Sequence, residues 1–499
     1  MVWSDHSSIM NHGHLLLMIS SPYDPAFHYT STEMEARTGN KVDVQMLVEQ
    51  PHVYILGRCS DTVVDQLCYT PYRLEDLHQM TQPLKNDRCV VDVMRFYHGD
   101  HPAISVEVGQ QEGGHYACTG CSLHSALWTD VVACFRAGGL TIQQRLDKVL
   151  AGPAGRKRRN GGIHPFKKLT LDELAAECAA RQLPVDHGQR LTKKRLQALL
   201  TEDLKGIQRV PALMFTCQNK DLETVNLTRY EALPSEPLHD IKEHIKNIVE
   251  ELPKHLNEEE TKAFDEVIET VLKSKDKQRG CDYRLCSIIL AINLGRCARI
   301  SIQKLLYTLA EMTGLIYDDA ENRTPRYILR LHNVTFMHSM VYQKVFKKPL
   351  KLTVRKAFGI YWHSITSHIP LVARIISPSS THTENEERFF NSINSISRTT
   401  SNGQPEHIIP NSILRLQAEN SMKTEPLPLA TQQSVISKYA ANLPDFSNTF
   451  IPEDMLESEI YQAHLERISD FLLPGENVWW YTDEESRGVV FHDSRGEPD

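Results

Sequence analysis

The stretch CVVDVMRFYHGDHPA, residues 89–103, gives the strongest indication of a fold in this chain. Its closely spaced valine, methionine and phenylalanine side chains suit a short buried strand, and Gly99-Asp100-His101-Pro102 is a turn signal directly behind it. Residues 15–19 and 53–56 are further short apolar segments with polar or proline flanks, which are typical of strands. We therefore expect residues 1–135 to form a mixed α/β domain.

Residues 206–400 have a different pattern, because their apolar side chains recur at helical spacing. Ile241, Ile245 and Ile248 share one face of a predicted helix, and Asn257-x-x-Glu260 is a capping box before the next. Residues 401–499 are loop-rich and acidic. The expected fold class is thus an α/β core with a large helical insertion and a mainly helical C-terminal half.

The composition of the 499 residues is that of a globular protein, with 41% hydrophobic and 24% charged residues. The apolar runs are far shorter than the roughly 20 residues that span a bilayer, so we expect no membrane partner. No cationic segment precedes an apolar one at the N-terminus, which argues against a signal peptide. The 11 cysteines are odd in number and scattered, which favours a reducing compartment.

Positive charge is concentrated in one segment although the net charge is −8. The segment begins with Arg156-Lys157-Arg158-Arg159 in a Gly-rich linker (151–165) and ends with Lys193-Lys194-Arg195. Apolar spacing within 169–204 predicts two short helices. Residues 151–205 are therefore predicted to be a basic linker and a small helical unit. The basic run 156–159 is a candidate for phosphate binding or nuclear import, and a solvated linker is the alternative.

Cys118-Thr119-Gly120-Cys121 is a C-x2-C pair, a spacing at which two thiolates can hold one Zn²⁺. The histidines that could complete the site are His239 and His244, or locally His115 and His124. His239 and His244 are five residues apart and cannot easily bind one ion from a straight helix. The alternative is a turn with two ordinary reduced cysteines.

Two carboxylate positions could serve a Mg²⁺ site. Asp100 directly follows the predicted strand, and Glu384 and Glu387 lie three apart at the start of a helix that Thr383-x-x-Glu386 caps. Alternatively, Asp100 stabilises a turn and the glutamates only complement the helix dipole. No Gly-rich phosphate loop is present, so we expect no nucleotide cofactor.

Four of these elements, in this order, resemble transposases of the CACTA/Plavaka-like group. They are Gly99-Asp100-His101-Pro102-Ala103, then Gly113-Gly114-His115-Tyr116-x-Cys118-x-x-Cys121, then Leu238-His239, then Glu386-Glu387-Arg388-Phe389. The last is similar to the E-R-x-F element of hAT-type transposases. The resemblance spans about residues 89–400 and extends to uncharacterised transposon-derived proteins of cnidarians. Residues 169–204 resemble a SAP domain, a short DNA-binding helical unit.

The resemblance implies an RNase H-like mixed-sheet core, here incomplete, with two Mg²⁺ ions on three carboxylates. Asp100 would be the second carboxylate and Glu387 the third, whereas the first has no clear counterpart, with Asp24 and Asp92 as candidates. Cys118 and Cys121 would bind structural zinc, with His239 as a third ligand. Glu236 stands where related sequences often have aspartate.

Three functions follow as expectations. The chain is a DDE/D-type transposase that cleaves and joins DNA, or a catalytically inactive domesticated or relic transposase that binds DNA, or a zinc-stapled scaffold without nucleic-acid function. The first two imply a nuclear protein with DNA as its partner and homo-oligomers as an option.

Overall fold

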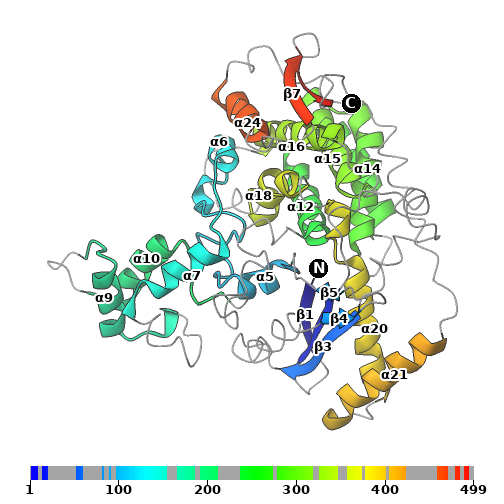
Figure 1. Cartoon of the computed structure of the whole chain (residues 1–499). Coiled ribbons are helices and arrows are strands. Elements are labelled where there is room, and N and C mark those ends of the chain that lie inside the picture. The colour runs from blue at the N-terminus through cyan, green and yellow to red at the C-terminus, as the bar shows by residue number, and fades with distance from the viewer. Residues whose placement is uncertain are drawn as a thin grey trace.

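The computed structural model shows how much of the chain can be described (Figure 1). The described residues are 2–8, 14–20, 52–59, 81–83, 89–91, 97–153, 166–185, 191–211, 236–273, 278–318, 325–346, 357–373, 377–400, 404–422, 458–469, 478–483 and 488–493. Asp24, Asp92 and the basic run Arg156, Lys157, Arg158 and Arg159 lie outside them. No helix among the described residues is long and apolar enough to cross a bilayer.

Helices make up most of the described residues, and they form the hydrophobic core. The largest cluster of buried side chains comes from helices and loops between Ala117 and Ala463, and none of its buried members lies on a strand. The prediction of an RNase H-like mixed sheet as the core is therefore wrong. Apolar residues at helical spacing supply far more buried surface here than the short strands do.

A small sheet of four strands has the order β3-β2-β1-β6. β1 pairs antiparallel with β2, β2 pairs antiparallel with β3, and β6 runs parallel to β1. The strands are β1 (Val2–Ser8), β2 (His14–Ser20), β3 (His52–Cys59) and β6 (Tyr97–His98). The predicted strands 15–19 and 53–56 lie within β2 and β3, whereas the predicted strand 89–97 is divided between β5 (Cys89–Val91) and β6. Two separate hairpins pair β4 (Thr81–Pro83) with β5, and β7 (Val478–Asp483) with β8 (Gly488–Asp493).

The helical body begins at α12, as the isoleucine spacing predicts. Glu236 is the N-cap, Pro237 occupies the first turn, and Ile241, Ile245 and Ile248 are fully buried. The body is formed by α6 (Val131–Phe135), α12 (Pro237–Glu251), α13 (Glu258–Ile268), α14 (Gly280–Cys297), α15 (Ile300–Ile316), α16 (Pro325–Phe346), α18 (Ile360–Ser367), α19 (Ile369–Val372) and α24 (Glu459–Ser469), with short turns at η1 (Ser125–Leu127), η5 (Leu252–His255), η6 (Glu269–Lys273) and η8 (Pro378–Ser380).

A separate arm of three helices projects from this body (Figure 1). It consists of α7 (Ile142–Leu150), α9 (Leu171–Ala180) and α10 (Lys193–Leu204), with η2 (Phe166–Lys168). The arm has its own core, in which Leu174, Leu196 and Leu200 are buried. The two helices expected within 169–204 are α9 and α10.

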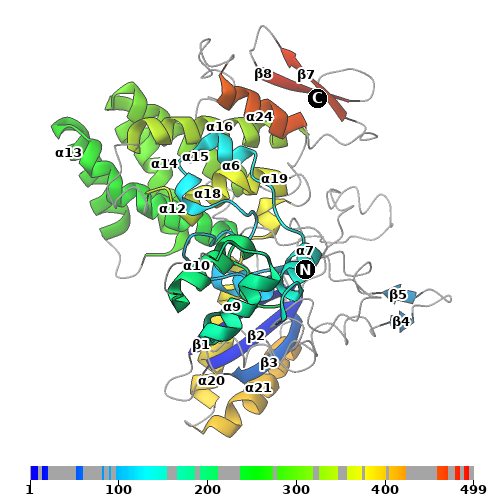
Figure 2. The same ribbon diagram turned by 90° about the vertical axis from the view of Figure 1, so that its left-hand side faces the viewer.

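Three further elements bring the sheet and the helical body together. α5 (His101–Glu107) follows β6 directly, and α20 (Glu384–Thr400) packs on α21 (Ile408–Met422), which continues from η9 (Pro405–His407) and contacts β3. Figure 2 shows α20 and α21 beside β1, β2 and β3. α21 begins within a segment expected to be a loop. The starts of α5, α12 and α20 meet at the site described next.

Candidate functional site

A buried group of two cysteines and two histidines lies between the arm and the helical body. Cys118 and Cys121 come from the loop after α5, His363 from α18, and His368 from the residue between α18 and α19. Their ligand atoms all lie within 4.8 Å of one another. Cys118 Sγ is 3.1 Å from His368 Nε2, and Cys121 Sγ is 3.1 Å from His363 Nε2. We call this group the Cys2His2 centre.

The Cys2His2 centre can hold a metal ion such as zinc. Two thiolates and two imidazoles are a preferred tetrahedral donor set. Burial opposes ionisation of Cys118, but the hydrogen bond from Cys121 and the nearby His368 lower its pKa well below the ordinary value. Gly120 is needed for close approach, because a Cβ atom there would lie 3.1 Å from the His368 ring.

Neighbouring side chains fix the ligands from outside. His363 Nδ1 lies 3.3 Å from Ser367 Oγ, and the His363 ring stacks on Trp128 at 5.0 Å between ring centroids. Arg145 is fully buried and donates hydrogen bonds to the Thr119 carbonyl at 2.7 Å and to Gln110 at 2.5 Å. Contacts of this kind orient metal ligands and set the tautomer of a histidine.

The sequence-based choice of a third ligand, His239, is corrected by this arrangement. His239 contacts Glu236 and Glu387 instead. His244 pairs with His338 at 2.9 Å, and His115 stacks on His124. His363 and His368 were missed. They are five residues apart, the spacing that argued against His239 and His244, but α18 ends at Ser367, so the two rings do not lie on one straight helix.

A second group of polar side chains forms where α5, α12 and α20 begin. Asp100 is the N-cap of α5 and accepts a hydrogen bond from the Ala103 amide at 2.9 Å. Glu236 is buried and accepts hydrogen bonds from the amides of Leu238, at 2.9 Å, and Thr383, at 3.0 Å. Glu236 therefore joins the start of α12 to the segment that leads into α20.

His239 is the centre of this second group. Its Nδ1 atom is 2.6 Å from Glu236 Oε2, and its Nε2 atom is 3.4 Å from Glu387 Oε1. Burial alone would lower the pKa of His239, but the hydrogen bond and charge of Glu236 raise it. The charges of Glu387 and Asp100 act in the same direction, and the pKa reaches about 9. Glu387 thus contacts the imidazolium directly, whereas Asp100 lines one cavity with His239.

The neighbouring glutamates of α20 are held by other partners. Glu384 forms an ion pair with the buried Arg284, whose guanidinium lies 4.0 Å from the centroid of the Tyr317 ring. Glu386 is buried 4.0 Å from His98, and burial raises the pKa of Glu386 to about 7. Among the three acidic residues in the first turn of α20, Glu387 is the one in contact with His239.

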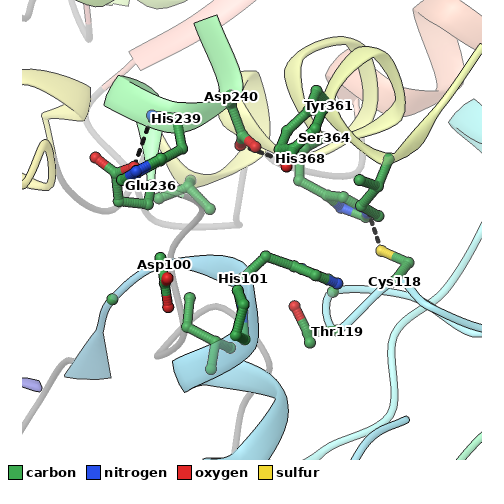
Figure 3. Close-up of a pocket in the computed structure, with 16 residues that line it drawn as sticks. Asp100, His101, Cys118, Thr119, Glu236, His239, Asp240, Tyr361, Ser364 and His368 are labelled. Carbon is green, nitrogen blue, oxygen red and sulfur yellow. Dashed lines mark hydrogen bonds and ion pairs between the residues drawn. The ribbon is translucent and has the colours of Figure 1, made fainter. Parts of the chain in front are cut away.

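A cavity of about 190 Å³ separates the two groups (Figure 3). Asp100, Glu236 and His239 line one end, and Cys118 and His368 line the other. The carboxylates and the Cys2His2 centre are therefore neighbours around one space. Of the basic residues predicted to bind DNA, Lys193 and Lys194 are exposed in the first turn of α10 and Arg195 is half-buried.

Comparisons with family models, with curated proteins and with solved structures find no match to this chain.

Proposed function

We propose that this chain is a transposase-derived DNA-processing protein that cleaves phosphodiester bonds with Mg²⁺ bound to carboxylates. The observation that supports this proposal is that Asp100 and Glu387, 287 residues apart in the sequence, lie around the same side chain: Glu387 contacts His239, and Asp100 lines one cavity with His239. Both residues stand in sequence motifs that predict metal-binding carboxylates. The Glu387 side chain remains 35% exposed, which leaves it accessible to a cation.

The pairing of β1 with β6 supports a proposal for the third carboxylate. Val2 pairs with Tyr97 and Trp3 with His98 in the parallel pairing of β1 with β6. Asp5 follows Trp3 by two residues on β1, and Asp100 follows His98 by two residues just beyond the end of β6. We propose Asp5 as the first carboxylate, in place of Asp24 or Asp92. Sequence reasoning missed it because residues 1–14 lack clear alternation.

Each residue of the site has a role in this reaction. Asp5, Asp100 and Glu387 would hold the metal, and bound Mg²⁺ would activate a water molecule and stabilise the leaving oxygen. Attack of the water oxygen on phosphorus breaks the P–O3′ bond and leaves a 3′-hydroxyl and a 5′-phosphate. The buried Glu236 keeps His239 charged beside Glu387, where the imidazolium balances the carboxylate before metal binds.

Zinc in the Cys2His2 centre would have a structural role in this protein. It would fasten the loop after α5 to α18, and therefore fix the position of Asp100 relative to α12. Four protein ligands leave no open coordination position, as in other structural zinc sites.

A plasmid nicking assay tests the cleavage proposal. The full chain with Mg²⁺ should convert supercoiled DNA to the nicked form. Asp5→Asn, Asp100→Asn and Glu387→Gln should each lower the rate by about a thousandfold, because metal catalysis contributes several kcal/mol. The matched controls Asp172→Asn and Glu259→Gln change exposed carboxylates and should keep the full rate. Equal rates in both sets would overturn the assignment of these carboxylates.

DNA binding without cleavage is the second candidate function. It is favoured by Lys193 and Lys194, which are exposed at the positive end of a helix where phosphate groups bind readily. A chain that binds DNA but does not nick it under any metal condition would support this candidate.

A further inference from the structure

The cavity between the carboxylates and the Cys2His2 centre has features that neither group explains. At about 190 Å³ it is smaller than the roughly 300–1,000 Å³ of pockets for drug-sized ligands. A whole nucleotide does not fit into such a volume, but one planar ring system does. Asp100 lines this cavity, so a group inside it would lie beside a molecule bound to the carboxylates.

Two buried ring nitrogens at this cavity lack a hydrogen-bond partner among the described residues. They are His101 Nε2 and His368 Nδ1. His368 Nε2 faces the Cys118 sulfur, so the unpaired Nδ1 lies on the other side of the ring. His101 lies along the floor of the cavity (Figure 3). Buried polar atoms are normally paired, and leaving them unpaired is costly, so a ligand with its own polar edge suits this space.

A third polar group faces the same cavity. Asp240 is 8% exposed, and its Oδ2 atom accepts a hydrogen bond from Ser364 at 2.5 Å. Burial raises the pKa of Asp240 well above its usual range, which favours the neutral acid. A neutral carboxylic acid can donate one hydrogen bond and accept others. The cavity thus offers donors and acceptors without a buried net charge on Asp240.

The remaining walls are apolar or aromatic. Ile104 and Val372 are buried at the cavity, and Ile360 and Tyr361 are half-buried at the start of α18. Apolar and aromatic walls combined with a few polar groups are the usual features of a pocket that accepts an unstacked base.

We propose that this cavity binds one nucleobase, unstacked from the DNA whose backbone lies on Asp100 and Glu387. The inference rests on the proposed function, because the carboxylates would place the phosphate beside the cavity. Unstacking costs least where a base is mismatched or single-stranded. The protein should therefore favour single-stranded or distorted DNA over an intact duplex.

The test uses the purified full chain and small probes, so it does not depend on cleavage. Calorimetry compares the four 2′-deoxynucleoside 5′-monophosphates with 2-deoxyribose 5-phosphate, which has the same phosphate and no base. At least one nucleotide should bind about tenfold more tightly than the sugar phosphate. Ile360→Trp fills the cavity and should remove this difference, whereas Ile300→Trp makes the same change at a position that is 61% exposed. Tyr361→Ala, which removes one wall, should weaken nucleotide binding if the Ile360 variant does not fold.

Equal binding of nucleotides and sugar phosphate, or a preference that persists in folded Ile360→Trp and Tyr361→Ala proteins, would overturn the proposal. A base preference in a chain that never nicks DNA would uphold the cavity and remove the proposed cleavage. Nicking without any base preference would uphold the proposed cleavage and remove the proposed base-binding role of the cavity.

Discussion

The buried pair His244 and His338 makes the stability of the helical body sensitive to acid. The two Nε2 atoms are 2.9 Å apart, and His338 Nδ1 lies 3.1 Å from Thr308 Oγ1. Both imidazoles are completely buried, and burial lowers the pKa of His338 to about 3. Each ring is therefore neutral in the folded protein, whereas in the unfolded chain it binds a proton below its ordinary pKa of about 6.5.

The size of the effect follows from linkage. A histidine whose pKa is lowered on folding stabilises the protein above about pH 6.5, and this contribution is lost as the pH falls. At pH 5, 1.5 pH units below the unfolded pKa, His338 should contribute about 2 kcal/mol of destabilisation, at about 1.36 kcal/mol per unit. His338→Gln keeps hydrogen-bonding groups but cannot titrate. The free energy lost between pH 7.5 and pH 5 should therefore be about 2 kcal/mol smaller in the variant than in the wild type.

Urea unfolding followed by circular dichroism across this pH range measures the difference. Loss of metal from the Cys2His2 centre at low pH affects both proteins and cancels in the comparison. His407→Gln removes an exposed histidine and should leave the wild-type pH dependence unchanged. Identical losses in wild type and His338→Gln would refute the reasoning.

Three other outcomes can be checked directly. Co²⁺ substitution should give the visible absorption band of a tetrahedral thiolate site. His363→Ala should abolish this band, and His239→Ala should preserve it. Loss of the band in the His239 variant would restore the sequence-based assignment of His239 as a ligand. Arg284→Met should destabilise the protein by about 3 kcal/mol in thermal unfolding, since it removes the buried cation beside Glu384 and leaves only the exposed Arg388, 3.5 Å away. A change under 1 kcal/mol would contradict this. Replacing Lys193 and Lys194 by Ala should reduce the slope of log K against log salt for duplex DNA by about 1.8 if each neutralises one phosphate; an unchanged slope would exclude the arm as the binding surface.

Local sequence patterns predicted the helices well, because their determinants are local. The isoleucine spacing of α12 and the capping box at Asn257 both correspond to the structure. The extent of sheet was overestimated, since β6 has only two residues and the apolar run before it does not form one strand. The core depends on which elements pack together, and spacing along the chain does not contain that information.

The candidate sites divide in the same way. Cys118 and Cys121 were found from their spacing, but 242 residues separate Cys121 from His363, and only tertiary packing brings them together. His239 was selected as a metal ligand because Leu238-His239 followed the cysteine pair in a family-like order. The structure instead gives it two carboxylate neighbours. Asp100 and Glu387 remain predictions as catalytic residues, supported by the contact of Glu387 with His239 and by the cavity that Asp100 and His239 both line.

The short loop that carries the two cysteines is also the mechanical connection between the arm and the helical body. Arg145 of α7 holds the Thr119 carbonyl, and Gln110 holds the carbonyls of Tyr116 and Lys205, so the arm is attached to this loop by several hydrogen bonds. On its other side the loop meets α18 through His363 and His368. A pulling force on the arm, such as that from a bound polymer, is therefore transmitted to α18 through the four side chains of the Cys2His2 centre. A metal ion bound there would determine the force at which the loop separates from α18.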